Sequence, residues 1–169
     1  GMQRFLPVLP NTAWFFYGSD PNHLSLREDV PGSGFHAKVF RSPLLPGFLS
    51  LLALPVAPFL LFPATARVLS RLAQILVKED AAALSVDVTE RHHYQLHIRE
   101  QHVAFLVDHK PVFHTHLCPL GRLGLVIWID NQYFKLTPEG EIGLGFLSTS
   151  TSQVMDVQNL ILTKNNGYD

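Results

Sequence analysis

The chain has 169 residues, of which 47% are hydrophobic and 16% are charged, and 13 Lys and Arg residues nearly balance 14 Asp and Glu residues. This composition excludes a disordered protein, and the absence of a basic block argues against a nucleic-acid-binding protein. A single cysteine excludes both an intrachain disulfide framework and a CxxC metal site. The length suits one domain over residues 1–169 with its own core.

The N-terminal residues show no signal-peptide pattern. Pro7 and Pro10 interrupt the sequence there, and no apolar run is long enough for a signal-peptide core. We therefore expect a cytoplasmic protein, which also agrees with the single cysteine.

The first elements predicted are two strands and a helix. Ala13–Tyr17 and Gly34–Phe40 are rich in aromatic or β-branched residues and are bounded by turn-forming sequences, as strands are. Residues 64–83 instead place apolar side chains at i, i+3 and i+4 spacing, with Arg67 and Arg71 on the other side. This pattern predicts one amphipathic helix over about 64–83.

Residues 42–66, which precede this helix, carry no charged side chain. The segment is long enough to cross a bilayer, but prolines at 46, 55, 58 and 63 would leave backbone groups unpaired in lipid. Two interpretations remain: a buried connection, or an exposed apolar surface for a hydrophobic ligand, a membrane interface or a second copy. The residues that would form such a homodimer contact are Leu44, Leu45, Phe48, Leu52, Phe59 and Phe62.

From Val86 onward the chain is predicted to consist of strands joined by turns. Alternating or continuous apolar runs of five to ten residues recur, separated by polar turn sequences. Many short strands of this kind predict a mainly all-β fold, an antiparallel β-sandwich or jelly roll with the one inserted helix. The predicted strands are His93–Ile98, Val103–Val107, Val112–Leu117, Leu123–Asp130, Ile142–Leu147 and Val154–Thr163.

The segment DVTERHHYQLHI at 87–98, followed by VAFLVDHKPV at 103–112, resembles the pattern D.TEWH.Y.I.W....V.F.VDG..V. This pattern recurs in the concanavalin A-like lectin/glucanase superfamily, notably in laminarinase-type glycoside hydrolases. The segment QVMDVQNLIL at 153–162 is similar to the final strand of that superfamily. The resemblance covers about 87–162, and it implies a jelly roll whose concave sheet binds carbohydrate. Arg91 and His109 depart from the pattern, which has Trp and Gly at these positions.

The catalytic motif of those hydrolases, a series of carboxylates on one strand face, is not found. Retaining glycosidases need two carboxyl groups about 5–5.5 Å apart. The candidate acids are Glu79 and Asp80, at the end of the predicted helix, and Asp87 and Glu90, whose spacing places them on opposite faces of a strand. We therefore predict no catalytic residue and expect binding without glycosidase activity.

The best candidate for ligand recognition is the run WIDNQY, in which aromatic rings and planar polar groups follow one another. Aromatic rings stack on sugar faces, while carboxylate and amide groups bind hydroxyls. The alternative is a core tryptophan followed by a turn that ends the strand. The predicted ligand-binding residues here are Trp128, Asp130, Asn131, Gln132 and Tyr133.

Two histidines extend this candidate site. If Ile98 pairs with Val103, and Val107 pairs with Val112, one face of the predicted meander is polar and can meet a ligand. That face carries His93, Gln95, His97, Ala104, Leu106, Phe113 and Thr115, while His114 and His116 fall on the core side.

His93 and His97 are predicted to bind a ligand rather than a metal. Four residues apart on one strand, they are separated by about 13 Å, too far to share one ion. No cofactor is predicted from this or any other motif in the sequence.

The sequence leaves three functions open. The first is a concanavalin A-like sandwich that binds carbohydrate. The second is a lipocalin-like protein that binds a hydrophobic ligand and uses the proline-rich segment as its entrance. The third is an interaction module that forms a homodimer through that same segment.

Overall fold

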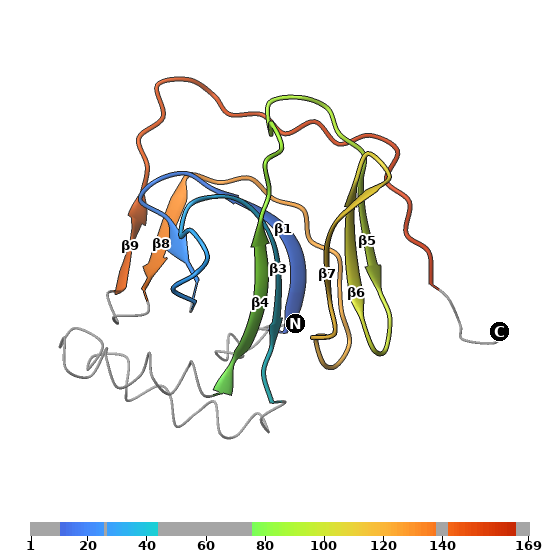
Figure 1. Ribbon diagram of the computed structural model, residues 1–169. Coiled ribbons are helices and arrows are strands. Elements are labelled where there is room, and N and C mark those ends of the chain that lie inside the picture. The colour runs from blue at the N-terminus through green and yellow to red at the C-terminus, as the bar shows by residue number, and fades with distance from the viewer. Residues whose placement is uncertain (1–10, 26, 44–75, 138–141, 165–169) are drawn as a thin grey trace, which may run out of the picture.

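The computed structural model describes residues 11–25, 27–43, 76–137 and 142–164. Within these ranges the protein is all-β, with nine strands in three sheets of three. Figure 1 shows how these sheets are arranged. The first sheet has the order β1-β3-β4, the second β5-β6-β7 and the third β2-β8-β9. The strands are β1 (Thr12–Gly18), β2 (His23–Leu24), β3 (Gly34–Arg41), β4 (Lys78–Ala83), β5 (Tyr94–Ile98), β6 (Val103–Val107), β7 (Lys110–Thr115), β8 (Gln132–Leu136) and β9 (Ile142–Phe146).

The core lies between the first two sheets. Alternate residues of an extended strand point to opposite faces, so Ala37 and Val39 of β3 share one face and meet Val103 and Phe105 of β6. All four side chains are fully buried. The ring of Phe15 on β1 closes the contact, edge-to-face on Phe105 with a centroid distance of 5.1 Å. These two sheets therefore fix the positions of β4 and β7 relative to each other.

Strand β4 corrects the helix prediction. Residues 78–83 form an antiparallel strand in register with β3, with Ala81 opposite Lys38. Three consecutive alanines favour a helix locally, but pairing with β3 and burial of Ala81 outweigh this preference. Residues 64–75 of the predicted helix lie outside the described residues. Among the described strands, β4 is the last of its sheet.

The strand predictions at β1, β3, β5, β6, β7 and β9 are confirmed within one or two residues, but two others are wrong. Leu123–Asp130 and Val154–Thr163 are irregular and exposed, and the strand that follows Asp130 is β8. Asp130 caps its start by accepting a hydrogen bond from the Gln132 backbone N–H at 3.1 Å. Apolar alternation was present in both segments, but strand structure also requires a paired neighbour.

The predicted register of β7 is also wrong. Ile98 pairs with Val103 as expected, but Val107 pairs with Lys110 rather than with Val112. The turn between β6 and β7 has only two residues, Asp108 and His109, both at positive φ of 49° and 64°. Two such residues are typical of the tight hairpin turn that matches strand twist. A bulge at Phe105/Leu106 absorbs the difference in register.

Because of this register, the side chains of β7 lie on the opposite faces from those predicted. Phe113 lies opposite Phe105 and packs against the core, and Thr115 is buried opposite Val103. His114 lies opposite Ala104 and is exposed, as is His116.

None of the described residues belongs to a helix long and apolar enough to cross a membrane. Residues 44–66 of the charge-free segment, including the six residues predicted to form a homodimer contact, lie outside the described ranges.

Candidate functional site

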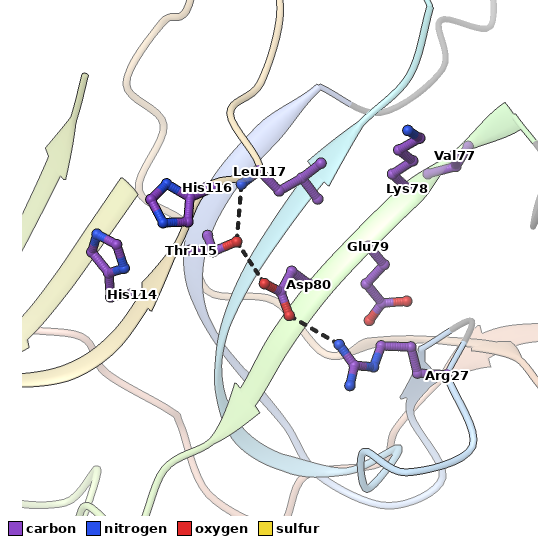
Figure 2. Close-up of a pocket in the computed structure, with 9 residues that line it drawn as sticks. All are labelled: Arg27, Val77, Lys78, Glu79, Asp80, His114, Thr115, His116 and Leu117. Carbon is purple, nitrogen blue, oxygen red and sulfur yellow. Dashed lines mark hydrogen bonds and ion pairs between the residues drawn. The ribbon is translucent and has the colours of Figure 1, made fainter. Parts of the chain in front are cut away.

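A cleft of about 720 Å³ opens where the edge strand β4 approaches β7 (Figure 2). This volume lies within the usual range of small-molecule sites. Both polar and apolar side chains line it, and they come from three segments that are far apart in the sequence. The lining residues are Arg27, Val77, Lys78, Glu79, Asp80, His114, Thr115, His116 and Leu117.

Asp80 lies at the centre of a hydrogen-bond network that crosses the cleft. Its carboxylate accepts from the Arg27 guanidinium at 2.9 Å and from the Thr115 hydroxyl at 2.5 Å. The Thr115 oxygen in turn accepts from the backbone N–H of Leu117 at 3.0 Å. Figure 2 shows Asp80 between Arg27 on one side and β7 on the other. The network therefore ties β4 to β7 and holds these groups in fixed directions.

Arg27 is itself oriented by a second carboxylate. Its Nε and one terminal nitrogen donate to the two oxygens of Asp29, at 2.8 and 2.6 Å. This paired hydrogen bond lowers the pKa of Asp29 below its ordinary value. The other terminal nitrogen is left to bind Asp80, so a planar guanidinium is fixed at the cleft wall.

Glu79 precedes Asp80 on β4, so its side chain lies on the opposite face of the strand and has different partners. Its Oε1 accepts from the Ser25 hydroxyl at 3.1 Å and lies 3.4 Å from the Lys38 ammonium. The side chains of Lys38 and Glu79 are 0% and 2% exposed. Burial lowers the pKa of Lys38, while the carboxylate of Glu79 opposes that shift. This buried ion pair joins β4, which forms one side of the cleft, to β3.

His36 shares this face of the β1-β3-β4 sheet with Lys38. It is fully buried, and neither ring nitrogen has a hydrogen-bond partner among the described residues. Burial lowers the pKa of His36, Lys38 lowers it further, and the carbonyls of Gly34 and Pro31 partly oppose both effects. The neutral imidazole is therefore favoured beside the buried cation.

Trp128 lies against this same face. Its ring is 5.5 Å from that of Trp14, which is opposite Lys38 on β1 and therefore points away from the core. Trp128 is 45% exposed, so part of its ring remains accessible.

The polar residues that follow Trp128 organise the β8–β9 hairpin. The Asn131 side chain donates to the carbonyl of Leu147 at 3.2 Å, and the Leu147 N–H donates back to the Asn131 carbonyl at 2.7 Å. Gln132 pairs with Phe146, and the ring of Tyr133 covers Gly145 so closely that a Cβ there would lie 2.8 Å from it. Asp130, Asn131, Gln132 and Tyr133 thus have local structural roles, and their predicted contact with a ligand stays a prediction.

The structure does not bring His93 and His97 near the Trp128 group. His97 lies opposite Ala104, on the face of the β5-β6-β7 sheet that points away from the core. The His93 ring packs on His109 at the turn, with centroids 4.6 Å apart. Two sheets and the core between them separate these histidines from Trp128, so one groove cannot contain both groups.

His114 of β7 and His116, just after that strand, line the cleft instead. The His114 ring lies 5.3 Å from that of His102 and 5.2 Å from that of His116. His116 is further held by a hydrogen bond between its Nδ1 and the Gln101 carbonyl, at 3.1 Å. The i, i+2 spacing of His114 and His116 was the available sequence signal, but the predicted register assigned both to the core. Among the described residues, no group of three or more potential ligands is arranged to hold a metal ion.

His92, which is not among the predicted site residues, forms an ion pair with Asp108. The pair lies where β5 begins and β6 ends. His92 Nδ1 and Asp108 Oδ2 are 2.8 Å apart, and the other carboxylate oxygen accepts from the His93 N–H at 2.9 Å. The hydrogen bond to Asp108 raises the pKa of His92 above 6.5. The hydrogen bonds from the His93 backbone and from His92 lower the pKa of Asp108 below 3.8.

We expect stabilisation by this pair to be greatest between about pH 4 and 6.5. Stabilisation by His92 is present below its unfolded pKa and lost as the pH rises through its raised folded value. Stabilisation by Asp108 is lost as the pH falls through its lowered folded value. Urea unfolding of the wild type and Asp108→Asn across pH 3–9 measures this, and the difference in stability between them should be largest between about pH 4 and 6.5 and smaller on either side. A His92 ring that titrates below 6.5 by NMR would contradict the assignment.

No family model, curated protein or solved structure matches this chain.

Proposed function

We propose that the protein is a β-sandwich of the concanavalin A-like type that binds a saccharide in the β4–β7 cleft without hydrolysing it. The observation that carries this proposal is the Arg27–Asp80–Thr115 network in a cleft of about 720 Å³. Two observations support the fold assignment: the β1-β3-β4 and β5-β6-β7 sheets pack face to face, and the hairpin motif lies at 87–112.

The chemistry of the cleft lining suits a ligand rich in hydroxyl groups. Each sugar hydroxyl both donates and accepts, so it needs donors and acceptors at fixed positions. Arg27 supplies donors and the carboxylate of Asp80 supplies an acceptor. Because Nδ1 of His116 donates to the Gln101 carbonyl, the neutral ring of His116 offers Nε2 as a second acceptor, and the imidazole of His114 has one donor and one acceptor nitrogen. The side chain of Leu117 adds an apolar contact for the C–H face of a ring.

The two carboxylates of the cleft favour binding over hydrolysis. Glu79 and Asp80 are adjacent on β4, so their side chains leave opposite faces of the strand. Each is engaged by a cation, Lys38 for Glu79 and Arg27 for Asp80. A glycosidase needs two carboxyl groups facing one bond, one of which carries a proton to the leaving group. This arrangement supplies neither requirement.

Calorimetric or NMR titration with a panel of neutral mono- and oligosaccharides tests the proposal. We expect His116→Ala to weaken binding by about tenfold, because it removes one direct hydrogen bond from an exposed position. His97→Ala is the control, since His97 is also an exposed histidine but lies on β5 and does not line the cleft.

Trp128→Ala distinguishes the two possible locations. If the ligand binds in the cleft, this variant should bind as the wild type does. Loss of binding in Trp128→Ala together with unchanged binding in His116→Ala would move the site to the Trp14–Trp128 face. If no saccharide binds at a concentration of about 10 mM, any binding free energy is weaker than about 3 kcal/mol, and the proposed function is overturned.

A further inference from the structure

Two like charges lie directly opposite each other where β3 ends and β4 begins. Arg41 and Lys78 are cross-strand partners in the antiparallel register, and both are exposed. Directly opposite residues have Cβ atoms about 5 Å apart, and like charges at that separation destabilise a sheet. Such a pair normally has a nearby carboxylate that offsets the repulsion.

No such carboxylate is found. Neither Arg41 nor Lys78 forms an ion pair with a described residue. Glu79 binds Lys38, and Asp80 binds Arg27. The sequence supplies no alternative nearby along the chain, because residues 30–78 contain no Asp or Glu. The carboxylates nearest in the chain are thus engaged elsewhere, and neither cation has an ion-pair partner among the described residues.

The two cations also line a recess with a fixed wall. A hollow of about 220 Å³ is bordered by Arg41 and Lys78 and, among neutral residues, by Ser42 and Leu120. Asn11 holds that wall: its side-chain nitrogen donates to the Ser42 hydroxyl at 3.1 Å, and its oxygen accepts from the Leu120 N–H at 3.0 Å. Lys78 lines the larger β4–β7 cleft as well, so the two hollows adjoin at this residue.

We propose that Arg41 and Lys78 form an oxyanion subsite, and that the saccharide bound in the cleft is an acidic one. This inference rests on the proposed function, because the cleft would take the sugar ring while the subsite takes its carboxylate or sulfate group. A guanidinium binds a planar carboxylate through two parallel hydrogen bonds, and an ammonium adds a point charge. Binding such a group also removes the repulsion between the two cations.

Titration with glucuronate and with glucose, which differ in charge at one carbon, tests the subsite. We expect glucuronate to bind about tenfold more tightly at low salt, and this preference to shrink toward equality at about 0.5 M NaCl because salt screens exposed charges. The variant Arg41→Gln, at a residue that lines the smaller hollow and not the cleft, should bind glucose as the wild type does and lose most of the preference for glucuronate. Lys110→Gln is the control, an exposed lysine of β7 that lines neither hollow.

Glucose 6-sulfate and inorganic sulfate complete the experiment. A preference for glucose 6-sulfate over glucuronate would assign the oxyanion as sulfate, and the reverse would assign it as carboxylate. If no sugar binds but inorganic sulfate saturably shifts the Arg41 and Lys78 NMR signals, the proposed function fails while the subsite stands. Equal affinity for glucose and both acidic sugars, or a preference that survives unchanged in Arg41→Gln, would overturn the subsite. Failure of both glucuronate and sulfate to shift these signals would overturn it as well.

Discussion

Glu79→Gln is expected to lower the free energy of unfolding by about 3 kcal/mol. The substitution keeps the size of the side chain but removes the charge that lies 3.4 Å from the ammonium of Lys38. Lys38 is fully buried, so it cannot turn to water for compensation. A buried charge that loses its ionic partner costs several kcal/mol, far more than the loss of a surface ion pair. Urea unfolding followed by circular dichroism measures the change.

The pH dependence of this cost separates the ion pair from simple packing. Burial lowers the pKa of Lys38 below 10.5, against the opposing effect of Glu79. The folded state therefore binds fewer protons than the unfolded chain just below pH 10.5, and stability rises with pH there. Removing Glu79 lowers that pKa further, so the cost of Glu79→Gln should shrink as the pH rises.

Two further variants make the result interpretable. Glu100→Gln, at an exposed position of the β5–β6 turn, should change stability by less than about 0.5 kcal/mol. Lys38→Met/Glu79→Leu should recover most of the loss, because a buried ion pair is often replaced by apolar residues at little cost. A cost for Glu79→Gln that is no larger than that of Glu100→Gln would show that Lys38 is not held as a buried cation.

Local sequence patterns were enough to predict strands that are strongly apolar or that pair with a strand close by in the sequence. The alternation of Leu96 and Ile98 in β5, and of Val103, Phe105 and Val107 in β6, defines one core face for each strand. Because only a short turn joins these strands, the pairing of Ile98 with Val103 followed as well. Local pattern and long-range packing agree in this part of the chain, and the prediction was correct there.

β4 could not be predicted in this way, because its local pattern and its tertiary environment disagree. The sequence KEDAAA contains good helix formers and no strong strand former. Only β3, which lies almost forty residues earlier, provides the hydrogen-bonding partner that makes it a strand. Since Glu79 and Asp80 are on β4, the error removed both carboxylates from the candidate site.

The cleft itself depends on long-range contacts of the same kind. Arg27 and Asp80 are 53 residues apart, and Asp80 and Thr115 are 35 residues apart. No motif links them, because their spacing reflects how two sheets approach each other rather than the geometry of one element. A shift in the β7 register, set by the two-residue turn at Asp108, reversed the faces of His114 and Thr115. Because of that shift, His114 lines the cleft instead of lying in the core as predicted.

Phe105→Ala is expected to cost about 4 kcal/mol in the free energy of unfolding. Phe105 is fully buried between the β1-β3-β4 and β5-β6-β7 sheets. Its ring contacts those of Phe15 and Phe113 at centroid distances of 5.1 and 5.5 Å. Truncation removes the apolar surface that Phe105 buries and leaves a cavity that rigid strands on both sides cannot close. Chemical denaturation with urea gives the difference directly.

Phe146→Ala is the matched control, because Phe146 on β9 is 74% exposed and its truncation should cost less than about 0.5 kcal/mol. Phe105→Leu should fall between the two, since leucine refills part of the cavity. Equal losses at Phe105 and Phe146 would contradict a core between the β1-β3-β4 and β5-β6-β7 sheets. The comparison also bears on function, because that core holds Asp80 of β4 within hydrogen-bond distance of Thr115. Phe105→Leu should therefore weaken binding of a saccharide in the cleft in parallel with stability, whereas Phe146→Ala should leave both unchanged.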